Sequence, residues 1–152
     1  MDISHTGICV SSIEVSSRFY CNVFEFEMGK LFTTGRELAP LLGIDGDLEF
    51  QCQFVFKNNF LLELLQFKIP GYVGSATARP MNKLGFTHLS FRVDQIDPIV
   101  AKVREYGGGF IESSRTRRQM PPSGYTEEVV FCTDPDGTRI ELMVMPNSVR
   151  FI

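Results

Sequence analysis

Two histidines and two glutamates occupy matching places in the two halves of the chain. His5 and His88 are the only histidines among 152 residues, and the stretches around them align at an offset of 83 residues. Glu63 and Glu141 each interrupt an apolar run later in their half. A charged group in such a run is costly to bury unless something pairs with it. Two imidazoles and two carboxylates therefore predict a divalent metal site.

The donor atoms narrow the choice of metal and of reaction. Imidazole nitrogen and carboxylate oxygen, without thiolate, suit Ni²⁺, Co²⁺, Zn²⁺, Mn²⁺ or Fe²⁺. Four protein ligands on a six-coordinate ion leave two positions for a bidentate oxygen substrate. The metal would stabilise charge that develops on a substrate enolate, and a carboxylate released from it could act as general base. Glu63 and Glu141 are both candidates for that base.

Each of the four residues also has a purely structural explanation. A lone histidine in a strand is more often a hydrogen-bonded core or edge residue than a ligand. A lone glutamate among leucines can be an exposed position of an alternating strand. The agreement in register between the halves favours metal ligation, because independent accidents would rarely align.

Hydrophobic periodicity predicts the order β-α-β-β-β in each half. The first half is expected to form a strand at 3–10, a helix at 13–24, and strands at 26–34, 48–56 and 60–67. The second half is expected to form a strand at 86–93, a helix at 95–106, and strands from 110, at 125–132 and at 138–145, with a polar loop at 113–124. We expect one domain over residues 1–152, with modules at 1–67 and 86–146 and a proline- and glycine-containing linker at 68–85.

Strand parity predicts which side chains face the metal. Residues of one parity share a strand face, so His88 and Arg92 share a face, as do Glu141 and Arg139. The opposite faces are apolar and should pack on the helices. We therefore expect an α+β fold in which the tandem modules form a curved, eight-stranded mixed sheet around the metal.

The same parity suggests residues that contact a substrate. Arg92 and Arg139 could pair with a substrate carboxylate, although cross-strand ion pairs are an equal alternative. Gln53 is a further candidate for the cavity lining. The basic segment 115–118 could hold an anionic tail, but a solvated loop is the better interpretation.

Composition excludes several classes of protein. A formal net charge of −3 gives no electrostatic support for nucleic-acid binding, and no apolar run reaches the roughly 18 residues of a membrane span. The first residues lack the pattern of a signal peptide. Four cysteines without a CxxC pair are expected to be free thiols in a reducing cytoplasm.

Three segments resemble the vicinal oxygen chelate superfamily, which includes glyoxalase I, methylmalonyl-CoA epimerase, extradiol dioxygenases and fosfomycin-resistance proteins. The matching segments are residues 19–24, 85–93 and 134–142, within a resemblance that spans residues 3–145. Glu25 departs from the family, which usually has glycine near that helix end. The closest similarity is to the glyoxalase-like and epimerase-like members.

The resemblance implies one divalent metal ion held by His5, Glu63, His88 and Glu141. A fourth ligand favours a lyase or isomerase that abstracts a proton next to a carbonyl, through a metal-stabilised enolate, from a 2-oxo compound or thioester. The alternatives are an Fe²⁺-dependent extradiol-type dioxygenase and a small-molecule binding or resistance protein. The resemblance also implies a homodimer, with the site built within one chain or across two.

Overall fold

The computed structural model describes residues 2–121 and 124–149. In its first half the elements are β1 (Thr6–Cys9), α1 (Ile13–Phe24), β2 (Glu27–Gly35), a 3₁₀ turn η1 (Arg36–Leu38), α2 (Ala39–Leu42), β3 (Glu49–Lys57) and β4 (Phe60–Ile69). In its second half they are β5 (Leu89–Arg92), α3 (Ile96–Glu105), β6 (Gly109–Met120), β7 (Tyr125–Thr133) and β8 (Arg139–Val144). The chain divides into two compact units, residues 1–75 and 76–152.

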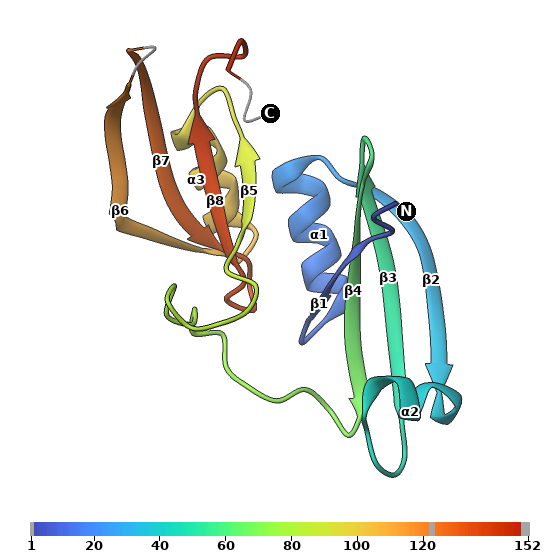
Figure 1. The fold of residues 1–152 in the computed structure, drawn as a ribbon. Coiled ribbons are helices and arrows are strands. Elements are labelled where there is room, and N and C mark those ends of the chain that lie inside the picture. The colour runs from blue at the N-terminus through green and yellow to red at the C-terminus, as the bar shows by residue number, and fades with distance from the viewer. Residues whose placement is uncertain (1, 122–123, 150–152) are drawn as a thin grey trace. The chain divides into compact units, whose positions relative to one another are not determined.

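Each unit holds one four-stranded mixed sheet (Figure 1). The strand order is β1-β4-β3-β2 in the first unit and β5-β8-β7-β6 in the second. In each sheet the short first strand runs parallel to its neighbour, and the remaining pairs are antiparallel. The predicted α+β class and the tandem βαβββ order are confirmed. Hydrogen-bonded pairing in the described residues stays within each half, so the eight strands form two sheets of four.

The helix α1 begins and ends where the sequence predicts. Ser12 is the N-cap, and its hydroxyl accepts a hydrogen bond from the backbone N–H of Val15 at 3.4 Å. Glu25 ends the helix with a φ of 58°, in the left-handed region that glycine adopts most easily. Glycine would adopt this conformation with less strain than glutamate does.

One face of the first sheet packs against α1. The side-chain amide of Gln66, on β4, accepts a hydrogen bond from the N–H of Ile13 and donates one to the carbonyl of Ser11. Leu62 and Leu64 share the parity of Gln66 and are fully buried. Glu63 therefore lies on the opposite face, which we call the site face of this sheet.

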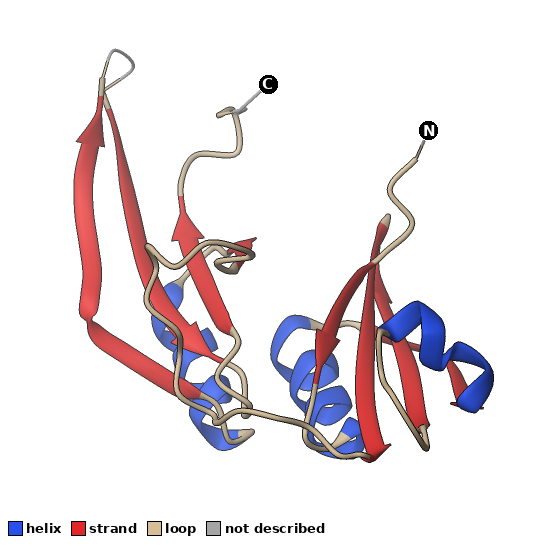
Figure 2. Cartoon of the chain, turned by 60° about the horizontal axis from the view of Figure 1, so that its bottom comes forward, coloured by secondary structure: helices blue, strands red, loops and turns tan. Residues whose placement is uncertain are grey.

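Part of this site face is covered by α2, which lies across the sheet from α1 (Figure 2). Ala39 and the residues around it pack with Leu48, Phe50 and Cys52 in an apolar cluster. Residues 36–42 form the 3₁₀ turn η1 and the short helix α2. None of the helices in the described residues is long and apolar enough to cross a membrane.

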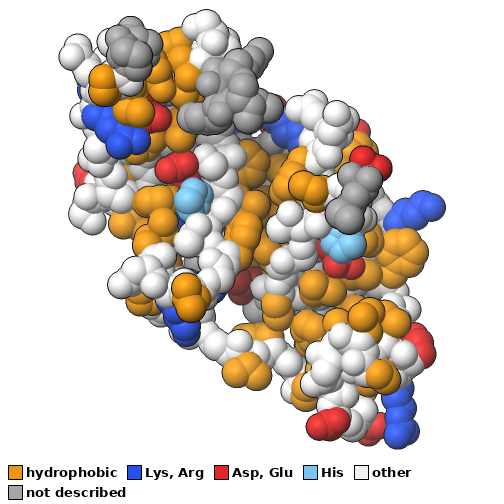
Figure 3. All heavy atoms as spheres, in the orientation of Figure 1, with side chains coloured by type: hydrophobic (Ala, Val, Ile, Leu, Met, Phe, Trp, Pro, Cys, Tyr) orange, Lys and Arg blue, Asp and Glu red, His pale blue; other side chains and the backbone are white. Residues whose placement is uncertain are grey.

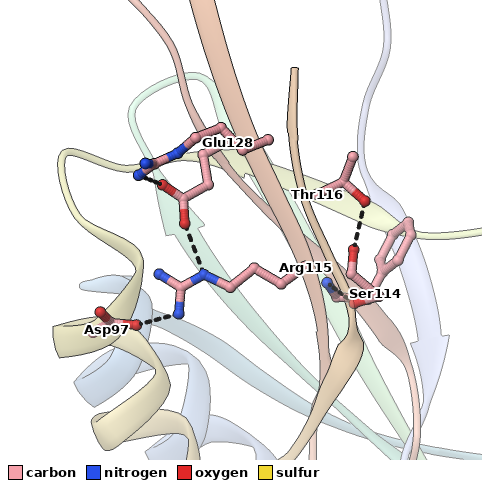
Figure 4. Close-up of polar contacts among 7 residues, drawn as sticks. Asp97, Ser114, Arg115, Thr116 and Glu128 are labelled. Atoms are coloured by element: carbon pink, nitrogen blue, oxygen red, sulfur yellow. Dashed lines mark hydrogen bonds and ion pairs between the residues drawn. The ribbon is translucent and has the colours of Figure 1, made fainter.

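The polar segment at 113–124 is a strand over most of its length, which corrects the predicted loop. β6 continues to Met120, and its arginines are paired with acidic residues on neighbouring elements (Figure 4). Arg115 donates to Asp97 of α3 and to Glu128 of β7, each at 2.7 Å. The charged side chains of this strand remain at the surface, where ion pairs with neighbouring elements compensate their charges.

The same network identifies the helix side of the second sheet. Glu128 shares the parity of Val130 and Cys132, which are both buried, and it is tied through Arg115 to α3. Glu141 pairs directly with Phe131, which has the other parity. Glu141 therefore lies on the face opposite α3, the site face of the second sheet.

A close backbone approach in the second unit requires glycine at position 137. Gly137 has a φ of +85°, and a Cβ there would collide with the backbone of Ala76. Gly46 has a similar φ of +94° but open space around it. We expect Gly46→Ala to cost roughly 1 kcal/mol from backbone strain alone. Gly137→Ala should cost about 1–3 kcal/mol more, because the neighbouring backbone must move.

Urea denaturation of the two glycine variants, followed by far-ultraviolet circular dichroism, measures this difference. Equal losses of unfolding free energy in the two variants would show that contact with Ala76 contributes nothing.

Candidate functional site

Each unit brings one histidine beside one glutamate. His5 and His88 lie immediately before β1 and β5, whereas the sequence placed them inside longer strands. Nε2 of His5 lies 3.3 Å from Oε2 of Glu63, and Nε2 of His88 lies 3.7 Å from Oε2 of Glu141. Both glutamate side chains are 17% exposed. Figure 3 shows histidine and carboxylate atoms in contact at the surface.

A phenylalanine completes each pair, and sequence reasoning missed both of these residues. Phe54 is the cross-strand partner of Glu63, and Phe131 is the cross-strand partner of Glu141. The ring of His5 meets Phe54 edge to face at a centroid distance of 5.6 Å, and His88 meets Phe131 at 5.4 Å. The signal was available: a phenylalanine stands in the second half of the strand that precedes each glutamate strand.

The phenylalanines limit how each histidine can lie. An edge-to-face contact fixes the plane of the imidazole ring against the sheet. The ring nitrogen that remains turned toward the glutamate is Nε2 in both halves. The two units therefore present the same arrangement of one imidazole nitrogen and one carboxylate oxygen.

The two carboxylates differ in what supports them. The hydroxyl of Ser90 donates a hydrogen bond of 2.7 Å to Oε2 of Glu141. Gly7 stands at the matching place in the first half and has no hydroxyl to offer. Glu63 instead lies beside the thiol of Cys52, and burial together with this carboxylate raises the pKa of that thiol to about 11. No disulfide involves any of the four cysteines.

The remaining ring nitrogens also differ between the halves. Nδ1 of His5 lies 2.9 Å from the hydroxyl of Ser4. Nδ1 of His88 is buried and has no hydrogen-bond partner among the described residues. Buried polar atoms usually have a hydrogen-bond partner, in structural and in metal-ligating histidines alike. The two histidines therefore differ in how their Nδ1 atoms are supported.

The donor set fits a borderline divalent metal. Each pair offers one imidazole nitrogen and one carboxylate oxygen, a combination that binds Zn²⁺, Ni²⁺, Co²⁺, Mn²⁺ or Fe²⁺. Within residues 2–121 and 124–149, no cluster of three or more such ligands is present. One unit supplies two donors, so the four-residue metal site remains a prediction.

The predicted substrate residues have distinct surroundings. Arg139 lies with its guanidinium carbon 5.5 Å from the centroid of Phe131, next to the second pair. Arg92 donates a hydrogen bond to the carbonyl of Val149. Gln53 is 4% exposed, and its amide donates to the carbonyls of Gly29 and Phe54. Gln53 also has the parity of the α1 face, so its amide is occupied in supporting the sheet.

A sequence profile of the Glyoxalase/Bleomycin resistance protein/Dioxygenase superfamily matches residues 2–142. The fold is that of a tandem βαβββ protein. The chain belongs to this superfamily, as the resemblance of its three motif segments suggested.

Two relatives extend along nearly the whole chain. Protein YaeR of Escherichia coli (strain K12) is 30% identical over 142 residues, which cover 92% of this chain and 93% of the relative. A probable lactoylglutathione lyase of Synechocystis is 26% identical over 145 residues, covering 94% and 95%. Among solved structures, a glyoxalase family protein from Bacillus cereus has the same fold, with a TM-score of 0.75 at 16% identity, covering 94% and 93% of the two chains.

Proposed function

We propose that this protein is a divalent-metal-dependent lyase or isomerase that abstracts a proton next to a carbonyl group of a small 2-oxo compound or thioester. The observation that carries the proposal is the repeated pairing of histidine Nε2 with glutamate Oε2 on the site face of each sheet. Membership of a superfamily that includes glyoxalases supports it, as does similarity to a probable lactoylglutathione lyase.

We assign His5, Glu63, His88 and Glu141 as the residues that would hold one metal ion. The two carboxylates would balance the two positive charges of the ion, and the neutral imidazoles would complete the donor set. When bound, the metal would polarise the substrate carbonyl and so make the neighbouring C–H bond more acidic. The ligands would come from one chain or from two copies in a homodimer.

The proton itself would pass to a glutamate. The hydrogen bond and the imidazole contact of Glu141 both involve Oε2. This arrangement leaves Oε1 to accept a proton from the substrate carbon. Glu63 is the second candidate base, since its side chain is equally exposed and has no serine hydroxyl beside it.

The aromatic neighbours would assist by restricting water. Phe54 and Phe131 cover one side of the two histidine rings. An apolar surface beside the carboxylates lowers the local dielectric and strengthens the interactions between charged groups and the substrate. These residues would therefore orient the imidazoles and exclude solvent without taking part in proton transfer.

Elemental analysis combined with hydrogen exchange tests the proposal. The purified protein should contain one divalent ion per set of four ligands, and the alanine variants of His5, Glu63, His88 and Glu141 should each lose it. The metal-loaded protein should exchange the proton next to the carbonyl of methylglyoxal hemithioacetal or methylmalonyl-CoA in D₂O. At a metal concentration 100 times the Kd, binding should stabilise the folded protein by about 2.7 kcal/mol.

The same measurements can reject the proposal. A protein whose melting temperature is unchanged by chelators, and whose four variants keep the wild-type metal content, has no such site. Oxygen uptake with catechols after reconstitution with Fe²⁺, in the absence of proton exchange, would instead identify a ring-cleaving dioxygenase.

A further inference from the structure

The guanidinium of Arg139 occupies an unusual place on the site face of the second sheet. Its guanidinium carbon lies 5.5 Å from the centroid of Phe131, and the ring of His88 lies 5.4 Å from the same centroid. Arg139 and Glu141 share a face of β8, two residues apart. One aromatic ring thus connects the arginine to the histidine–glutamate pair.

This guanidinium has donors without acceptors. Nε and Nη1 of Arg139 are buried atoms that have no hydrogen-bond partner in the described part of the chain. A buried donor on a charged group is costly to leave unpaired, so native structures usually provide an acceptor. The stacking on Phe131 holds the guanidinium in position but satisfies none of its N–H groups.

The strand carboxylates on the same face are already engaged. Glu141 accepts a hydrogen bond from Ser90 and contacts His88. Glu127 is 2% exposed and pairs with Arg118 at 2.7 Å. Neither carboxylate accepts a hydrogen bond from Nε or Nη1 of Arg139, so a bound ligand can supply the missing acceptor.

We propose that Arg139 binds a carboxylate of the substrate, so that the protein acts on 2-oxo acids or on thioesters that carry a carboxylate. The proposal rests on the function proposed above, because the carboxylate would belong to the same molecule whose carbonyl the metal would polarise. Arg139 and His88 both contact the ring of Phe131.

The charges near Arg139 favour an anionic ligand. Arg118 is matched by Glu127. Arg92 donates only to the carbonyl of Val149, and Nε and Nη1 of Arg139 have no partner among the described residues. The planar donors of one guanidinium match the two oxygens of a carboxylate.

Pyruvate and methyl pyruvate form a matched pair of probes. They share the 2-oxo group, but only pyruvate carries a carboxylate. We expect pyruvate to shift the ¹⁵N-detected Nε–H resonance of Arg139 in a saturable manner, both in the Zn²⁺-loaded full chain and after treatment with EDTA. Methyl pyruvate should leave this resonance unchanged, and inorganic phosphate should bind more weakly than pyruvate.

Variants of two arginines separate charge from geometry. Arg139→Gln should weaken pyruvate binding by about tenfold to hundredfold, as expected for hydrogen bonds to a charged group. Arg139→Lys keeps the charge but loses the planar donors, so its affinity for pyruvate should fall between those of the wild type and Arg139→Gln. Arg104 also lies over a phenylalanine ring, that of Phe110 at 5.0 Å, but on the exposed surface of α3. Arg104→Gln should therefore bind pyruvate as the wild type does.

Several results would overturn the inference. Equal responses to pyruvate and methyl pyruvate, tighter binding of phosphate, or unchanged binding in Arg139→Gln would each contradict it. The comparison of ligands on the wild-type chain needs no variant, so misfolding of a variant cannot mask the answer. The EDTA-treated chain reports pyruvate binding at Arg139 without metal. A failure of the metal-dependent function is therefore distinguished from a failure of anion binding.

Discussion

Replacement of Glu141 with glutamine should lower the rate of substrate proton exchange by about 10²- to 10⁴-fold, the usual contribution of a general base. Glutamine keeps the size of the side chain and can still accept a hydrogen bond from Ser90, so the fold should be preserved. It lacks the negative charge that the metal requires and the basicity that the proton requires. The measurement is the exchange rate in D₂O together with the metal content of the same sample.

Two further variants test whether the loss of proton exchange arises from the Glu141 carboxylate. Glu112→Gln changes an exposed glutamate on β6 of the same unit and should leave metal content and exchange unchanged. Ser90→Ala removes only the hydroxyl that holds Oε2, and should cost about 10–100-fold in metal affinity or activity, as outer-shell partners do. Full metal content and full exchange in Glu141→Gln would remove Glu141 from the site.

Truncation of Phe19 should produce the largest loss of stability, about 3–5 kcal/mol of unfolding free energy. Phe19 is fully buried on α1, and its ring meets those of Tyr20 and Phe24 at 5.3 and 5.8 Å. Phe19→Ala would leave a cavity among rings that cannot collapse freely. Urea denaturation monitored by far-ultraviolet circular dichroism gives the difference from wild type.

Val15 on the same helix provides the matched control. Its side chain is 45% exposed, so Val15→Ala should change the unfolding free energy by no more than about 0.5 kcal/mol. A loss below about 1 kcal/mol in Phe19→Ala, or equal losses in the two variants, would show that the interior beneath α1 tolerates a void.

Local signals predicted the fold well where the deciding interactions are close in sequence. The helix at 13–24 was predicted to the residue, because a serine cap and apolar spacing define it. The predicted loop at 113–124 was wrong because polarity was taken as a sign of irregular structure, whereas β6 is a largely exposed strand. β6 pairs with β7, and its arginines form ion pairs with Glu127 and Glu128 of that strand. These partners lie too far along the sequence for a local pattern to reveal them.

The residues of the candidate site also divide into those that local sequence predicted and those that depend on other strands. Parity on β4 and β8 correctly assigned Glu63 and Glu141 to the faces opposite α1 and α3. Parity alone could not show that the amide of Gln53 donates to the carbonyl of Gly29. That carbonyl lies in a bulge of β2 between Met28 and Leu31, which arises from the pairing of β2 with β3. The roles of Phe54 and Phe131 likewise depend on cross-strand register.

The alternation along β4 and β8 has a consequence for how this chain can change over time. Insertion or deletion of one residue inside either strand would exchange its glutamate with a leucine or isoleucine neighbour, moving a charge under a helix and hydrocarbon toward the solvent. Single-residue length changes should therefore be better tolerated at the hairpin around Asn58 and in the segment between β4 and β5, where no such exchange follows.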